Sequence, residues 1–243
     1  MIDSRDAMDP RYREHRAHIE EGFSPEYLEQ TERETEVSPS GKYRLTVDGY
    51  SRGPNSWGYS RGTVVNLDSG KVIADIKRNL AMFWHTWIQH ANGQEYLLCG
   101  EDYQGQSVVN LGQKSTNHYF PDSGYAGGGF CWAAAWPNQD STILAVEGCF
   151  WACPYEVVFY DLSQPDTLPY RELLRIDEPD SIEGWTEGGD FRMTQSVYTR
   201  KSDGVPYAEL SDDEQDSIDQ DGSLAEDIKR TVVVHQDQIL TIE

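Results

Sequence analysis

Three acidic residues follow short apolar segments at a regular spacing along the chain. They are Asp48, Glu101 and Glu147. If the segments are equivalent strands around one axis, the carboxylates converge on a ring that could grip a basic side chain, bind a cation or support acid–base chemistry. Alternatively, each carboxylate lies at a hairpin turn and accepts hydrogen bonds from nearby backbone amides. We favour the second interpretation.

A cysteine in an aromatic setting is the next candidate for chemistry. The sequence Gly148-Cys149-Phe150-Trp151 matches the GCFW sequence of peptide methionine sulfoxide reductases, in which the cysteine opens a helix and attacks sulfur. Here the residues after it, including Pro154, indicate a turn and then a strand. We therefore interpret the match as chance and predict no catalytic residue.

Metal and cofactor sites are not indicated by the remaining motifs. Structural zinc usually needs two closely spaced ligand pairs, and the cysteines offer one. The sequence has no phosphate-binding glycine loop, no G-x-S-x-G elbow and no HExxH. We predict no metal, no cofactor and reduced cysteines. Of the four, which are Cys99, Cys131, Cys149 and Cys153, three have apolar or aromatic neighbours that suit buried free thiols. The alternative is that Cys149 and Cys153 pair, or share a zinc with Cys99 or Cys131.

The charge balance is strongly acidic. There are 20 basic and 42 acidic residues, a formal net charge of −22. Such a field repels nucleic acid and anionic membranes and favours basic partners, cations or solubility at high salt. Nine of the acidic residues lie between Glu209 and Asp227, without a basic one, which is typical of a solvated loop or tail. No signal peptide or membrane span is visible, so we expect a cytoplasmic protein.

The elements that would position these residues form a repeat. A turn, an apolar strand, a loop and a Val-rich strand recur four times, and the first strands are anchored 53, 47 and 48 residues apart, at Tyr43, Tyr96, Ile143 and Phe191. A near-constant period indicates stacked supersecondary units. We predict one β domain over 37–243, with repeats at about 37–80, 81–122, 128–175 and 182–243 and an acidic insertion at 208–228 in the last.

The repeat resembles a known family pattern. Ser38-Pro39-x-Gly41-Lys42, followed by a strand and by Val-Val-Asn-Leu-Asp-Ser-Gly-Lys at 64–71, looks like the blade pattern of WD40-like and TolB-like β-propellers. The resemblance covers 37–175 well and 183–242 more weakly, and no Trp-Asp dipeptide ends a blade. It implies an all-β fold, a small or incomplete β-propeller of about four repeats. An open propeller and a twisted β-sandwich remain alternatives.

The first 36 residues differ from the rest, because they are polar and charged. Asp9-Pro10 and Ser24-Pro25 are signals for helix starts. We therefore predict a short helical N-terminal extension over residues 1–36.

The loops between the two recurrent strands should emerge on one face of a propeller. They are rich in aromatic and acidic residues, which supply many interface anchors when exposed; alternatively, the rings pack beneath the loops as satellite core. The candidate partner-binding residues are Tyr50, Trp57, Tyr59, Glu101, Asp102, Tyr103, Glu147, Phe150, Trp151 and Tyr155.

These features support three functional hypotheses. The first is a non-enzymatic module that binds a basic protein, such as an immunity protein or an inhibitor that neutralises a toxin or a nucleic-acid-acting enzyme. The second is a small-ligand-binding or hydrolytic propeller with a central pocket formed by Asp48, Glu101 and Glu147. The third is a protein whose acidity is only an adaptation to salt. We favour the first, and the sequence leaves the identity of the partner open.

Overall fold

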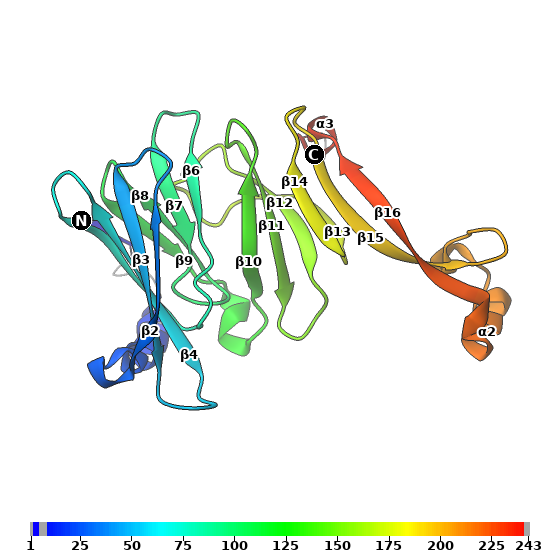
Figure 1. The fold of residues 1–243 in the computed structure, drawn as a ribbon, viewed down its shortest axis with the longest axis horizontal. Helices are drawn as coiled ribbons and strands as arrows, with labels where there is room; N and C mark the ends of the chain where they lie inside the picture. The colour runs from blue at the N-terminus through cyan, green and yellow to red at the C-terminus, as the bar shows by residue number, and fades with distance from the viewer. Residues whose placement is uncertain (1, 5–8, 241–243) are drawn as a thin grey trace.

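The computed structural model describes residues 2–4 and 9–240 and arranges them as four β-sheets side by side (Figure 1). We call the sheets blades 1 to 4 in chain order. Blade 1 contains β2 (Leu28–Val37), β3 (Tyr43–Ser51), β4 (Gly58–Asn66) and β5 (Val72–Arg78). Blade 2 contains β6 (Thr86–Gln89), β7 (Glu95–Cys99), β8 (Gln106–Asn110) and β9 (Ser115–Tyr119), with β1 (Ile2–Asp3) added parallel to β9.

The second half of the chain forms two more blades of sequentially adjacent antiparallel strands. Blade 3 contains β10 (Phe130–Pro137), β11 (Ile143–Phe150), β12 (Glu156–Asp161) and β13 (Glu172–Asp177). Blade 4 has three strands in the described part of the chain, namely β14 (Ser181–Trp185), β15 (Phe191–Arg200) and β16 (Ala225–Val234). The predicted all-β fold, a small or incomplete propeller of about four repeats, is confirmed.

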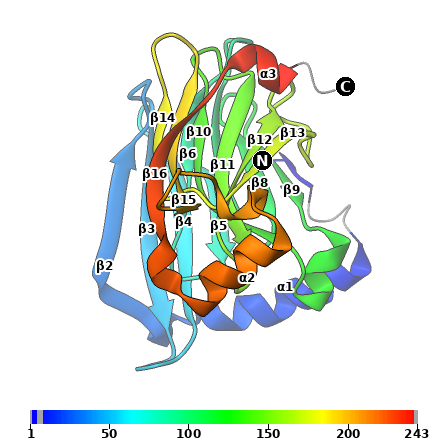
Figure 2. The same cartoon turned by 90° about the vertical axis from the view of Figure 1, so that its right-hand side faces the viewer.

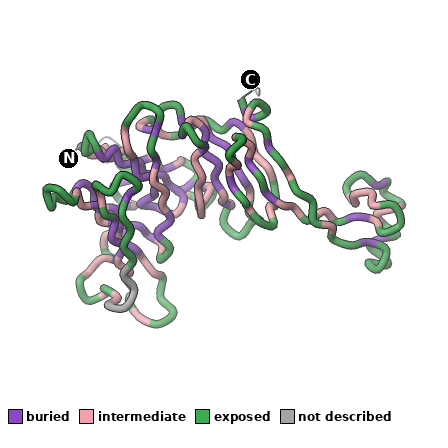
Figure 3. Tube along the Cα trace, turned by 45° about the horizontal axis from the view of Figure 1, so that its top comes forward, coloured by how far each residue is buried: buried purple, intermediate pink, exposed green. Residues whose placement is uncertain are grey.

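The two central blades bury both of their faces. In β7, Leu97 packs toward blade 1 and Leu98 packs toward blade 3. In β11, Leu144 packs toward blade 2 and Ala145 packs toward blade 4. Successive side chains of a strand point to opposite faces, so a strand buried on both sides tends to be apolar at consecutive positions. This is why β7 and β11 contain apolar runs, and Figure 3 shows much of the two central blades as buried.

The two end blades bury only one face. Leu45 of blade 1 packs against blade 2, whereas its neighbour Arg44 is exposed. Met193 of blade 4 packs against blade 3, whereas its neighbour Arg192 is exposed. The row of blades therefore ends in polar faces, and blade 4 lies at the opposite end from blade 1 (Figure 1). The propeller is open.

Helices occupy the edges of the sheets. The α-helices are α1 (Pro10–Glu20), α2 (Asp212–Gln220) and α3 (Gln236–Leu240), and short 3-10 turns cover Glu21–Phe23, Pro25–Tyr27, Asp122–Ala126, Tyr207–Glu209 and Gly222–Leu224. Asp9 caps α1 by accepting a hydrogen bond from the backbone of Arg11. None of the helices in the described residues is both long enough and apolar enough to cross a membrane.

The predicted N-terminal extension is only partly helical. Residues 1 and 5–8 lie outside the described residues, and α1 forms where the Asp9-Pro10 signal places it. The second predicted helix is a single 3-10 turn at Pro25–Tyr27, and residues 28–36 belong to β2. The correction has a physical reason: the backbone of β2 pairs with β3, and this pairing outweighs the low strand preference of its charged residues.

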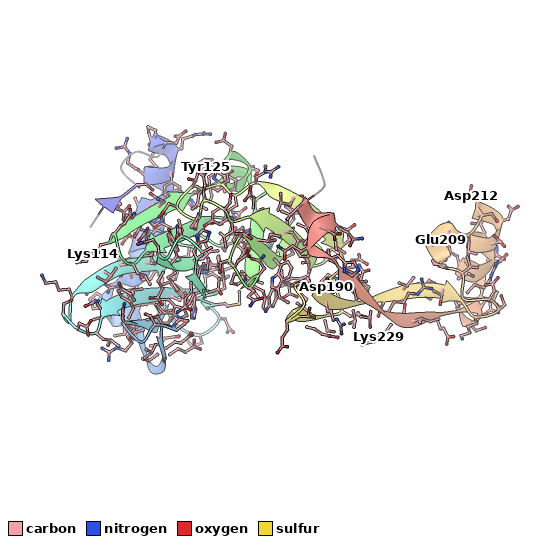
Figure 4. The ribbon with its side chains drawn as sticks, turned by 90° about the horizontal axis from the view of Figure 1, so that it is seen from above. Lys114, Tyr125, Asp190, Glu209, Asp212 and Lys229 are labelled. Carbon is pink, nitrogen blue, oxygen red and sulfur yellow. The ribbon has the colours of Figure 1, made fainter. Side chains whose placement is uncertain are left out.

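The predicted acidic insertion is a long arm. Strands β15 and β16 pair over ten residues each and carry residues 201–224 away from the blade (Figures 1 and 2). The tip has its own small core, formed by Leu210, Ile218 and Ala225. Figure 4 shows Glu209 and Asp212 at the far end of the arm. The insertion is therefore an ordered element, and its predicted last residues, from Ala225 on, belong to β16.

Candidate functional site

Three aromatic side chains from three different blades meet at the surface. Trp57 lies in the β3–β4 loop, Tyr103 in the β7–β8 loop and Trp151 in the β11–β12 loop. The ring centroid of Trp57 is 6.1 Å from that of Tyr103 and 6.0 Å from that of Trp151, and the Tyr103 and Trp151 centroids are 5.5 Å apart. Trp57 is 46% exposed and Trp151 56%. We call these three residues the aromatic cluster.

One buried residue, Asn79, holds two members of the cluster in place through its backbone carbonyl and its side-chain amide. The Trp57 indole donates a hydrogen bond of 2.5 Å to the Asn79 carbonyl oxygen. The Asn79 side chain accepts a bond of 2.8 Å from the Tyr103 backbone and donates one of 2.5 Å to Asp102. Asn79 is 6% exposed. A single residue after β5 thus fixes the positions of the loops from blades 1 and 2.

The residue before it is a fully buried arginine. The Arg78 Nη1 atom donates to the carbonyl oxygens of Gly100 and Asp102, each at 2.9 Å, and Nε donates to the carbonyl of Met82. Burial lowers the pKa of Arg78 to about 10, and the carboxylate of Asp102 opposes this shift. Sequence reasoning missed both Arg78 and Asn79, because a charged residue at a strand end is normally solvated.

Two predicted binding residues, Glu101 and Asp102, lie beneath α1 rather than on a binding face. They are 2% and 0% exposed. The Tyr12 hydroxyl donates a short hydrogen bond to Glu101, and His15 Nε2 is 2.7 Å from the Asp102 carboxylate. Both partners belong to α1. This corrects the prediction for the two residues: their carboxylates dock the helix and cannot reach a partner.

Two predicted aromatic residues also have an internal role. Tyr50 is 6% exposed and Tyr59 is half-buried. Their ring centroids lie 5.1 Å and 5.6 Å from that of Phe23, which comes shortly after α1. They hold the N-terminal segment against blade 1, as the satellite-core alternative anticipated. Tyr50 is therefore removed from the predicted binding face because it is buried.

The remaining predicted residues lie in or beside the β11–β12 loop. Tyr155 is 47% exposed and Phe150 is 38% exposed, with the Phe150 ring 5.3 Å from that of Phe130. Glu147 is half-buried, and burial raises the pKa of its carboxyl group. These three residues extend the exposed surface next to Trp151.

The three repeated carboxylates do not form an open ring. Glu101 is covered by α1. Asp48 pairs in register with Arg61 on the face of blade 1 opposite its core. The central carboxylate pocket required by the hydrolytic hypothesis is therefore incomplete.

A serine and a histidine in blade 2 have the spacing seen in hydrolytic triads. The Ser107 hydroxyl lies 2.8 Å from His118 Nδ1, and His118 Nε2 lies 3.4 Å from the Asp3 carboxylate. Ser107 is 0% exposed and also accepts a bond from the Glu101 backbone. A substrate cannot reach it, so these residues form a structural network. In the described part of the chain, no three potential metal ligands converge.

Comparisons with known proteins do not define a function. No protein family model matches the chain. An uncharacterized protein of Acanthamoeba polyphaga mimivirus is 41% identical over 154 residues, which cover 61% of this chain. The match spans 59% of that relative's length.

Two solved β-propeller domains are similar in structure. The β-propeller domain of the trilobed protease from Pyrococcus furiosus aligns with 70% of this chain and 48% of its own, at a TM-score of 0.42 and 11% identity. The β-propeller domain of Swd1 from Myceliophteria thermophila aligns with 72% of this chain and 47% of its own, at a TM-score of 0.37 and 12% identity. This chain thus spans about half of each domain's chain.

Proposed function

We propose that this protein is a non-enzymatic, cytoplasmic interaction module that binds a protein partner through the aromatic cluster. The observation that carries the proposal is the meeting of Trp57, Tyr103 and Trp151 at the surface from three separate blades. Exposed tryptophan and tyrosine rings on a rigid scaffold are typical binding anchors, because they bury a large area at a low entropic cost.

The partner we propose is basic. The net charge of −22 attracts a basic protein over a long range and disfavours nucleic acid and anionic membranes. A protein of this kind could neutralise a basic toxin or a nucleic-acid-acting enzyme, as an immunity protein or an inhibitor does. The acidic arm adds to the field, with Glu209 and Asp212 at its far end (Figure 4).

The test is capture of the partner at low salt with wild type and a Trp151→Ala variant. Trp151 is 56% exposed and its indole makes no hydrogen bond to a described residue, so its removal should leave the fold intact. The matched control is Leu67→Ala, since Leu67 is 40% exposed on the β4–β5 turn. We expect the affinity for the captured basic protein to fall roughly 30-fold in Trp151→Ala, as for a typical hot spot, and to stay unchanged in the control.

Salt provides the second measurement. Capture of the basic partner should weaken steeply as the ionic strength rises, because screening removes the long-range attraction. A partner that binds equally to wild type and Trp151→Ala would refute the role of the cluster. The absence of any partner at low salt would refute the proposed function.

A further inference from the structure

A cavity of about 260 Å³ lies between blades 2 and 3. Blade 2 contributes Gln104, Gln106 and Tyr119, and the first turn after β9 contributes Pro121. The opposite wall is the side of blade 3, with the rings of Phe130 and Trp132. None of the three residues of the aromatic cluster lines this cavity, although Phe150, beside Trp151, does. A ligand site here does not require the proposed function, because the residues that carry it are not those of the cluster.

The amide of Gln106 lines the cavity and has no hydrogen-bond partner among the described residues. Gln106 is only 8% exposed, and its side chain makes no hydrogen bond to any described residue. Gln104, two residues earlier, is fully engaged: it donates to the Gly124 carbonyl and accepts from the Gly129 backbone. The Gln106 amide lines the cavity, and its two polar atoms are not among the fully buried ones that lack a partner. The donor and the acceptor therefore open onto the cavity, where a ligand can meet them.

The wall that faces Gln106 is aromatic. The ring of Trp132 lies 5.0 Å from that of Tyr160 and 6.4 Å from that of Tyr170. All three residues line the cavity and are largely buried. Such a wall favours a ring-shaped ligand with apolar faces, and the small volume limits it to one or two fused rings.

The charges at the rim neutralise one another. The Arg175 guanidinium pairs with both Glu156 and Glu172, the latter at 2.7 Å, and lies 4.9 Å over the ring of Phe130. The rim therefore offers no unpaired positive charge that could bind an acidic group of a ligand. The overall negative field also disfavours a phosphate.

We propose that this cavity binds a neutral nitrogen heterocycle of the nucleobase type. The Gln106 amide offers one donor and one acceptor side by side, and a base edge offers the complementary pair. Glutamine pairs with adenine in this bidentate way, and aromatic side chains pack against base faces. The free base, rather than its phosphorylated form, suits the acidic surroundings.

The experiment compares wild type with Gln106→Met, which keeps the length of the side chain and removes its polar atoms. Calorimetric titration with adenine should show binding to wild type and at least roughly a tenfold loss of affinity in the variant, since two hydrogen bonds are removed. Without ligand, the melting temperature of Gln106→Met should be close to that of wild type, because the amide makes no hydrogen bond to a described residue. The matched control is Gln113→Met, an exposed amide outside the cavity, which should bind adenine like wild type.

Three results would overturn the inference. The first is no binding of adenine to wild type at millimolar concentration, and the second is equal binding to wild type and Gln106→Met. The third is a lower melting temperature for ligand-free Gln106→Met, which would mean that the amide has a structural partner. Two further ligands test the class: adenosine monophosphate should bind more weakly than adenine, and glucose should not bind. Tighter binding of either would contradict the assignment to a neutral base.

Discussion

At the scale of single residues, Asn79 connects the interior of the protein to its candidate binding surface. Its backbone carbonyl accepts from Trp57, and its side chain binds both Tyr103 and Asp102. Two of these partners belong to the β7–β8 loop, and the third belongs to the loop of another blade. The geometry of the aromatic cluster thus depends on a residue that a partner never touches.

The first prediction concerns this amide. Asn79→Ala removes one of the three hydrogen bonds of the Asp102 carboxylate, which keeps those to His15 and the Gln104 backbone. It also leaves the Tyr103 backbone amide without its bond, and a loss of this kind costs about 1–3 kcal/mol when the group is buried. We expect a decrease of this order in the free energy of unfolding, measured by urea denaturation. The control is Gln113→Ala, since Gln113 is exposed and its side chain makes no bond to a described residue. Equal stability of the two variants would contradict the positioning role.

Local sequence patterns identified the exposed aromatic rings but not the buried residues that hold them in place. Trp57, Tyr103 and Trp151 could be predicted as neighbours because the repeat places their loops on one face. Glu101 and Asp102 were wrongly placed on that face, because nothing in their own strand shows that a helix from the N-terminus covers them. Contacts between residues far apart in sequence depend on packing that a repeat period does not encode.

At the scale of elements, α1 is held to blade 2 by buried polar bonds. Tyr12 is 1% exposed and bonds to Glu101, and Arg16 Nη1 donates to the Glu101 carbonyl oxygen at 3.1 Å. The helix has a thin apolar face, so hydrogen bonds supply much of its specificity. This arrangement orders the N-terminal segment against the sheet.

The second prediction concerns the Tyr12 hydroxyl. Tyr12→Phe keeps the ring and removes the hydroxyl that donates to the buried Glu101 carboxylate. Loss of this hydrogen bond should lower the free energy of unfolding by about 1–3 kcal/mol. Burial and the Glu101 charge also raise the pKa of Tyr12, so the hydroxyl keeps its proton at neutral pH. Urea denaturation should show a clear loss of stability for Tyr12→Phe and none for Tyr125→Phe, whose hydroxyl bonds to no described residue. Unchanged stability of Tyr12→Phe would mean that this hydroxyl contributes nothing to the docking of the helix.

Two elements show where the sequence was and was not informative. The segment Thr35-Glu36-Val37 reads as polar, yet its strand pairs along β3, because an edge strand can be charged and still satisfy its backbone. Helix α2 lies within what was interpreted as a solvated acidic run. Its capping box, Ser211 with Glu214, was a readable signal that the charge pattern obscured.

The third prediction is a pH response of the arm. Glu214 caps α2 and pairs with Arg200 at 2.6 Å. These bonds hold the pKa of Glu214 at about 2, below its ordinary value of 4.5. Because the folded pKa is depressed, the stabilisation is fully present above pH 4.5 and is lost as the pH falls toward 2.

The amide resonances of α2, followed by nuclear magnetic resonance during acidification, provide the measurement. In wild type they should move toward unfolded positions in that window. In Glu214→Gln the part of this movement that comes from Glu214 should be missing, because the amide carries no proton equilibrium. Identical titrations would assign the response to another carboxyl group of the tip.

At the scale of the whole molecule, the open row of blades is stable because each end blade has one apolar inner face and one polar outer face. The central blades supply apolar side chains to both neighbours, and each end blade supplies them to one. Arg44 on blade 1 and Arg192 on blade 4 lie on the outer faces, which pack against no other blade. Terminal units with a polar outer face are what soluble repeat proteins need. The same polarity disfavours end-to-end association of two copies.

The fourth prediction is therefore that the protein is monomeric. Analytical ultracentrifugation should give one sedimentation coefficient over a wide range of concentrations, since neither outer face offers a large apolar patch. The double variant Arg192→Leu/Thr231→Leu tests the reason. Both residues are exposed on blade 4, and the new leucines would join Val233, which is 36% exposed, in an apolar patch. We expect this variant to associate as its concentration rises. If wild type already forms dimers, or if the variant remains monomeric, the polar outer faces are not the reason for a monomeric state.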